Sequence, residues 1–155
     1  MKAAHPDIVV IGPDGEYLML VEVKLSNSNV RSKSVIDQLR HLMASIGCSV
    51  GLVVSGEHIF LLRDSLEKAY GESIDVVGEA KLPDSLLPPA DEQWRGLHAL
   101  EFESRVQRWL ENLKLASNLE NLPSDLRELF GEPIMGLLRL GEVRAAGPRW
   151  SRVAS

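Results

Sequence analysis

The sequence has few of the residues that would identify a function directly. It contains one cysteine, Cys48, which excludes an internal disulfide, and no group of Cys and His residues has zinc-ligand spacing. Aromatic residues make up 5% of its 155 residues, so aliphatic side chains must fill most of the core. No apolar run reaches the roughly 18 residues that span a bilayer, and the N-terminus lacks the apolar core of a signal peptide. We therefore expect a cytoplasmic protein without membrane contact.

An excess of positive charge is also absent. The formal net charge is −5, which argues against general binding to polyanions, so any nucleic-acid contact must come from a local patch. The length and a hydrophobic content of 45% suit one globular domain with a single sizeable core.

The first half of the sequence alternates strand and helix patterns. The predicted elements are strands at 8–12 and 17–25, a helix at 34–46, and strands at 49–55 and 58–63. Pro13, Asp14 and Gly15 are typical of the turn in a β-hairpin. Because the helix joins the first hairpin to the next strand, it is predicted to be a crossover between parallel strands.

Helical spacing dominates the second half, and three prolines within 83–91 favour a surface connection. We expect an α/β core at 1–82, a linker at 83–97, helices at 98–140 packing on the core, and a flexible tail at 141–155. This order of elements predicts an α/β (α+β) fold with a central mixed sheet flanked by helices and extra C-terminal helices.

Three charged residues lie inside the otherwise apolar first hairpin, at Asp7, Glu22 and Lys24. If the turn closes between Gly12 and Tyr17, residues that face each other have numbers that sum to 29. Asp7 then lies opposite Glu22, and Lys24 projects from the same face of the sheet. A slip of one residue would separate them, so the prediction depends on the length of the turn.

Two carboxylates at this spacing repel each other, and a divalent cation would offset that repulsion. Oxygen ligands without Cys or His favour Mg²⁺, or alternatively Mn²⁺. The competing interpretation is an ordinary solvated ion pair at the end of a strand, worth about 0–1 kcal/mol and without function.

Pro6-Asp7 followed by Glu22-Val23-Lys24 resembles the PD-(D/E)XK motif of the restriction-endonuclease-like nuclease superfamily. The resemblance covers mainly residues 6–64 and includes the order strand, turn, strand, helix, strand. It implies a restriction-endonuclease-like core and metal-dependent hydrolysis of phosphodiester bonds in DNA.

The resemblance also implies roles for individual residues. Asp7 and Glu22 would bind the metal, aided by the backbone carbonyl of Val23, and Lys24 would orient or help activate the attacking water. Gln38 resembles a glutamine of exonuclease-like branches, although those branches place Tyr four residues later and this chain has Leu42. Nucleases that cut two strands often dimerise, so a homodimer is implied as well.

The chain departs from the family at its start. Many members have an N-terminal helix before the first motif strand, often with another acidic residue. Here the chain is a fragment, or a later segment or a second subunit covers that side of the sheet.

Basic residues cluster around the predicted helix 34–46, where they could contact DNA phosphates or simply be solvated. They are Arg31, Lys33, Arg40 and His41. The alternative to a nuclease is a nuclease-like fold that serves as a binding or assembly module without catalysis. The acidic balance and the missing first helix favour that alternative.

Overall fold

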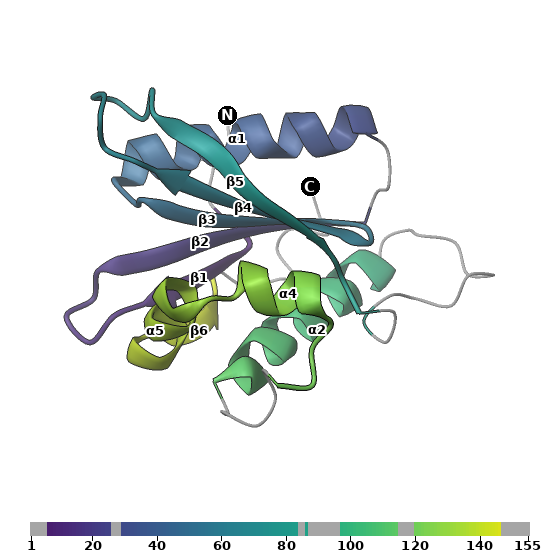
Figure 1. Ribbon diagram of the computed structural model, residues 1–155. Helices are drawn as coiled ribbons and strands as arrows, with labels where there is room; N and C mark the ends of the chain where they lie inside the picture. Colours follow the sequence, from purple (N-terminus) through teal and green to yellow (C-terminus); the bar gives the residue numbers. More distant parts are fainter. Residues whose placement is uncertain (1–5, 26–28, 84–85, 87–96, 115–119, 147–155) are drawn as a thin grey trace.

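The computed structural model describes residues 6–25, 29–83, 86, 97–114 and 120–146, with the backbone alone described at 29–32 and 97–99. The chain forms a mixed six-stranded sheet with helices on both faces (Figure 1). The strands are β1 (Ile8–Ile11), β2 (Tyr17–Lys24), β3 (Val50–Ser55), β4 (His58–Asp64), β5 (Ile74–Lys81) and β6 (Glu142–Ala145). The helices are α1 (Asn29–Ile46), α2 (Leu97–Leu113), α4 (Ser124–Leu129) and α5 (Glu132–Leu140). The predicted α/β (α+β) class with a mixed sheet is confirmed.

The sheet has the order β5-β4-β3-β2-β1-β6. Strands β2 and β3 run parallel and the other neighbouring pairs run antiparallel. Helix α1 connects the two parallel strands, which confirms the predicted crossover. No helix in the described ranges is both long enough and apolar enough to cross a membrane.

The first hairpin has the predicted register over three pairs, from Ile8 opposite Val21 to Val10 opposite Met19. Each pair sums to 29. The ladder shifts by one residue next to the turn, where Ile11 pairs with Tyr17. Gly15 adopts a φ of 84° in the turn, a left-handed conformation that glycine reaches without strain. The turn chemistry therefore fixes which residues of β1 and β2 face each other.

Helix α1 covers one face of the sheet with a stripe of apolar side chains. The stripe consists of Val35, Leu39, Leu42 and Met43, and it packs on Val9, Leu20, Val53 and Leu62. Gly51 of β3 lies directly beneath the helix. A Cβ atom there would lie 2.7 Å from Met43 Sδ and 2.8 Å from Leu39 Cδ2. The missing side chain at Gly51 thus lets α1 lie close to the sheet.

Helices α2, α4 and α5 cover the opposite face and build the larger core (Figure 1). The α2 stripe consists of Phe102, Val106, Leu110 and Leu113, and it joins Ile8, Val10, Met19 and Val21 in one cluster. Trp109 and Phe130 meet edge to face, with ring centroids 5.5 Å apart. Segments from the second half of the chain therefore cover this face of the first hairpin.

The structure differs from the expected tail at 141–155. Residues Glu142–Ala145 form β6, which pairs antiparallel with β1 along its whole length. The strand alternates polar and apolar residues, but it has four residues and Val143 is its one buried side chain, so the local pattern is too short to predict a strand. Residues 147–155, and most of the expected linker at 83–97, lie outside the described residues.

Candidate functional site

Cross-strand pairs arrange the face of the sheet under α1 into three successive rows. The inner row contains Leu20, Gly51, Leu62 and Val76; the middle row contains Glu22, Val53, Phe60 and Glu79; the outer row contains Lys24, Ser55, His58 and Lys81. Paired residues project from the same face, and rows two residues apart share it. Asp7 precedes β1, and its hydrogen bonds to Val21 and Val23, the two neighbours of Glu22 in β2, place it beside Glu22 at the end of the middle row.

Asp7 is held between two strands by its backbone and its side chain. Its N–H donates to the carbonyl of Val21 at 3.1 Å, and its carbonyl accepts from the N–H of Ala146 at 3.0 Å. Its Oδ2 accepts from the N–H of Val23 at 2.8 Å. The side chain is 8% exposed. These bonds fix the carboxylate of Asp7 against β2, beside Glu22.

Glu22 is 1% exposed, and its Oε1 has no hydrogen-bond partner among the described residues. Burial, first of all, and then the negative charge of Asp7 raise the pKa of Glu22 from 4.5 to about 8, against the opposing effect of the Lys24 ammonium. A carboxyl group in this position holds a proton at neutral pH unless a cation replaces it. The middle row therefore contains an acid whose charge the fold does not neutralise.

Lys24 ends β2 on the same face as Glu22, with an exposed side chain. Its backbone carbonyl accepts from the N–H of Gly56 at 2.8 Å, which ties the end of β2 to the β3–β4 turn. The effect of Lys24 on the pKa of Glu22 shows that its ammonium acts on the buried acid. The structure thus brings Asp7, Glu22 and Lys24 together at one end of the hairpin.

Glu103 is a further buried acid, on the helix that covers the opposite face of the sheet, and the sequence analysis missed it. It lies on α2, is 5% exposed, and its charge also raises the pKa of Glu22. It precedes Val106 by three positions and Leu110 by seven, so it belongs to the apolar stripe of the helix. A carboxylate inside an apolar stripe is the pattern that could have identified it.

The structure places the remaining candidate residues along α1, away from any described contact with the two acids. Gln38, Lys33 and His41 are exposed. Arg40 is half-buried and pairs with Asp37 at 3.5 Å. The side chain of Arg31 lies outside the described residues. We therefore find no geometric support among the described residues for Gln38 as part of the acidic site.

The donor set suits a cation that needs few protein ligands. No group of three or more Asp, Glu, His or Cys side chains in the described ranges is arranged to hold a metal ion. Mg²⁺ commonly binds one or two carboxylates and keeps several waters. The carboxylates of Asp7 and Glu22 and the carbonyl of Val23 are ligands of that type and number. The unpartnered Oε1 of buried Glu22 is the atom that such a cation would satisfy.

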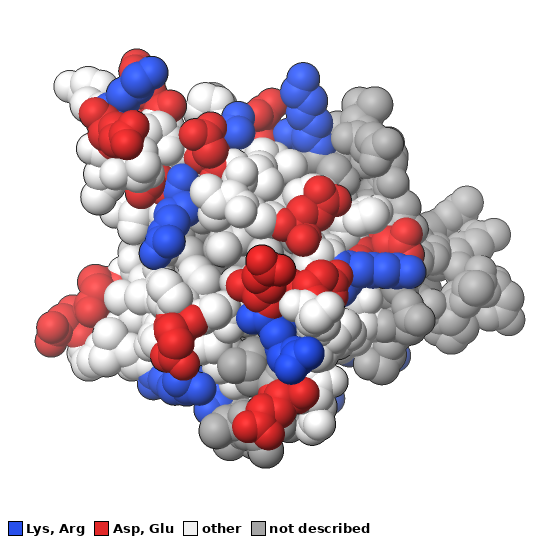
Figure 2. Space-filling view, in the orientation of Figure 1, with Lys and Arg blue, Asp and Glu red and all other residues white. Residues whose placement is uncertain are grey.

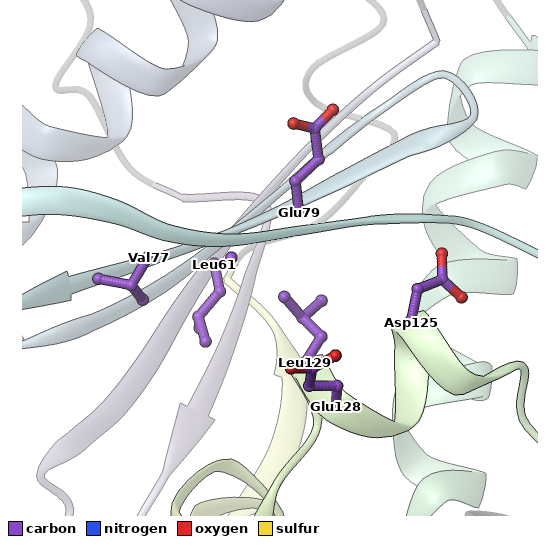
Figure 3. Close-up of a pocket in the computed structure, with 7 residues that line it drawn as sticks. Leu61, Val77, Glu79, Asp125, Glu128 and Leu129 are labelled. Carbon is purple, nitrogen blue, oxygen red and sulfur yellow. The ribbon is translucent and has the colours of Figure 1, made fainter.

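Two cavities of the molecule lie elsewhere. One, of about 270 Å³, lies between β4, β5 and α4, where Leu61, Asp125 and Leu129 line it (Figure 3). The other, of about 470 Å³, lies beside the end of α1 and the segment before β5. Neither is lined by Asp7, Glu22 or Lys24.

Comparison of the chain with protein-family models, with curated proteins and with solved structures found no match in any of the three. The functional argument therefore depends on the site itself.

The raised pKa of Glu22 predicts that stability falls with pH. The folded chain binds this proton with a pKa of about 8, against an ordinary value of 4.5. The stabilisation is therefore complete below about pH 4.5 and is lost as the pH rises through about 8. We expect the free energy of unfolding of wild type, measured with urea in metal-free buffer, to fall between about pH 5 and pH 9. The fall should be on the order of 4 kcal/mol larger than in Glu22→Gln.

Glu132→Gln is the matched control, because Glu132 is exposed on α5. The difference in free energy of unfolding between Glu132→Gln and wild type should stay constant over the same pH range. Parallel pH curves for wild type and Glu22→Gln would show that Glu22 titrates normally and would contradict the prediction.

Proposed function

We propose that this chain hydrolyses phosphodiester bonds in DNA with a divalent cation, Mg²⁺ or Mn²⁺, in the manner of PD-(D/E)XK nucleases. The observation that carries the proposal is the carboxyl group of Glu22, which is buried opposite Asp7 and has an unpartnered oxygen. A bound cation would neutralise carboxyl groups that are buried away from solvent in this way.

An ordinary ion pair at a strand end accounts less well for this geometry. Exposed pairs of that kind contribute about 0–1 kcal/mol. Glu22 is instead buried, and the charges that act on it are those of Asp7, Lys24 and Glu103. It forms no ion pair within 4 Å among the described residues. Burying an unpaired acid is unfavourable, which is typical of functional rather than purely structural positions.

Each residue of the motif has a role that follows from its position. Asp7 and Glu22 would hold the cation together with the Val23 carbonyl, and the bond from Val23 N–H keeps the Asp7 carboxylate oriented toward β2. The cation would supply a water of lowered pKa and a Lewis acid for the phosphate. Lys24, whose side chain is exposed beside the buried acids, can reach substrate and hold the attacking water through its ammonium.

The coverage of the sheet supports the same proposal. The resemblance leaves the second face of the motif hairpin without its usual N-terminal helix. Helix α2 packs on that face and brings the buried acid Glu103 into electrostatic contact with Glu22. Helix α2 thus covers this face of the hairpin and adds a buried acid whose charge raises the pKa of Glu22.

The second candidate function is a nuclease-like fold that binds or assembles without catalysis. Two observations favour it. Acidic and basic side chains are interspersed on the face shown in Figure 2, with no continuous basic groove. In addition, Glu22 is 1% exposed and Asp7 is 8% exposed, so both acids are largely closed to a substrate in this structure.

Cleavage of plasmid and linear DNA with Mg²⁺ or Mn²⁺ tests the proposed activity. Glu22→Gln should remove a cation ligand without changing the shape of the side chain, and Lys24→Ala should remove the group that holds the water. Each should lower the cleavage rate by at least about 100-fold, the ordinary contribution of one positioned group. The measurement is the initial rate of strand scission on gels.

Arg139→Ala is the control, since Arg139 lies on α5, on the other face of the sheet, and pairs with Glu132 at 3.9 Å. Its rate should equal that of wild type. Undiminished cleavage by both Glu22→Gln and Lys24→Ala would reject the assignment.

Calorimetric titration with Mg²⁺ and Mn²⁺ separates the two candidate functions. The nuclease proposal predicts binding by wild type, with proton release at neutral pH that disappears well above pH 8, because the cation displaces a proton that Glu22 carries only below its pKa of about 8. Asp7→Asn and Glu22→Gln should each abolish the heat of binding. A folded wild-type protein that binds neither cation would favour the binding module.

A further inference from the structure

The outer row continues away from Lys24 across three more strands. Lys24 pairs with Ser55, Ser55 with His58, and His58 with Lys81. Neighbouring strands lie about 4.8 Å apart, so the row extends about 14 Å from β2 to β5. It lies one pleat beyond the residues that α1 covers, at the end of the sheet where β3 turns into β4 (Figure 1). The row therefore forms a polar margin that begins at the proposed catalytic site.

The basic groups of this margin are held by weak and exposed ion pairs. His58 lies 3.8 Å from Glu57 and 3.8 Å from Glu79, and Lys81 lies 3.9 Å from Glu57. In Figure 3, Glu79 points to the opposite side of β5 from Leu61 and Leu129, and so toward the α1 face. Exposed pairs at such distances are worth little, so a phosphate can replace the carboxylates as the partner of the Lys81 ammonium and of the His58 ring N–H.

The dimensions and chemistry of the margin suit a nucleic-acid backbone. One DNA strand carries a charge about every 3.4 Å along the helix axis, so 14 Å faces several phosphates. Ammonium and imidazole groups contact phosphates without selecting a base sequence. The carboxylates of Glu57 and Glu79 repel phosphates, so they should lower the affinity for DNA.

We infer that the outer row guides one strand of the DNA substrate across the ends of β2 to β5, with phosphates contacting His58 and Lys81 beyond the site at Lys24. The inference rests on the proposed function, because it takes DNA as the substrate. It assigns His58 and Lys81 to substrate positioning, whereas Glu79 limits the affinity by competing for His58.

Fluorescence anisotropy with a labelled DNA duplex in metal-free buffer tests this path without cleavage. Lys81→Ala should weaken binding about 3- to 10-fold and lower the slope of log affinity against log salt by about 0.9. His58→Ala should weaken binding in the same direction. Glu79→Gln should strengthen binding, because it removes a competing carboxylate from the same row.

The pair Arg139→Ala and Glu132→Gln is the matched control, with the same two charge changes on α5 on the other face of the sheet. Neither should alter affinity or salt slope. Lys81→Arg should restore binding, which a purely structural role of Lys81 would not predict. Equal affinities for wild type, Lys81→Ala and Glu79→Gln would overturn the inferred path.

Cleavage assays on the same proteins separate failure of the path from failure of the function. If wild type cleaves DNA and depends on Glu22, while the outer-row variants bind and cleave as wild type does, the path is wrong and the proposed function stands. If the outer row controls binding but no cleavage occurs with either cation, the path stands and the nuclease proposal is overturned. A wild-type protein that neither binds nor cleaves DNA contradicts both.

Discussion

The burial of Glu22 opposite Asp7 is the constraint on which the proposed site depends. Two carboxyl groups lie side by side on one hairpin, and Asp7 is fixed there because its backbone is bonded to Val21 of β2 and to Ala146, the residue after β6. The ladder register places them together, and the length of the turn fixes that register. Burial of these two carboxyl groups is electrostatically unfavourable, whereas the two core clusters of the sheet consist of apolar side chains.

The two layers of helices make this arrangement possible in different ways. Helix α1 lies close over Gly51 and covers the inner row, so the apolar core ends directly beside the acids. Helix α2 covers the opposite face and brings Glu103 near Glu22. Strand β6 closes the edge next to β1 and fixes Asp7 through Ala146. Segments from the C-terminal third of the chain thus complete a site whose motif lies within the first 24 residues.

Much of this arrangement could be predicted from local patterns. The hairpin register followed from Pro13, Asp14 and Gly15, and the helix between parallel strands followed from the spacing of apolar residues. These features are decided by contacts between residues close in sequence. The proximity of Asp7 and Glu22 could be predicted for the same reason, since both residues belong to one hairpin.

The remaining features depend on contacts between residues far apart in sequence. Strand β6 has one buried residue, Val143, and exists because β1 offers it an edge for pairing. Glu103 becomes part of the site only through the packing of α2 across the sheet. Helix α1 begins at Asn29, whereas the predicted start is Ser34, since the apolar spacing that indicates a helix begins at Val35. Tertiary packing, rather than local propensity, decided each of these.

The most direct measurement of the central claim is the titration of Glu22 itself, followed by the ¹³C chemical shift of its side-chain carboxyl group in metal-free solution. The account predicts a midpoint near the pKa of about 8, and a lower midpoint in Asp7→Asn, where the facing charge is removed. Addition of Mg²⁺ should lower the midpoint in wild type but not in Asp7→Asn. A midpoint near 4.5 in wild type, unchanged by Asp7→Asn, would show that the two acids do not share a buried site and would contradict the account.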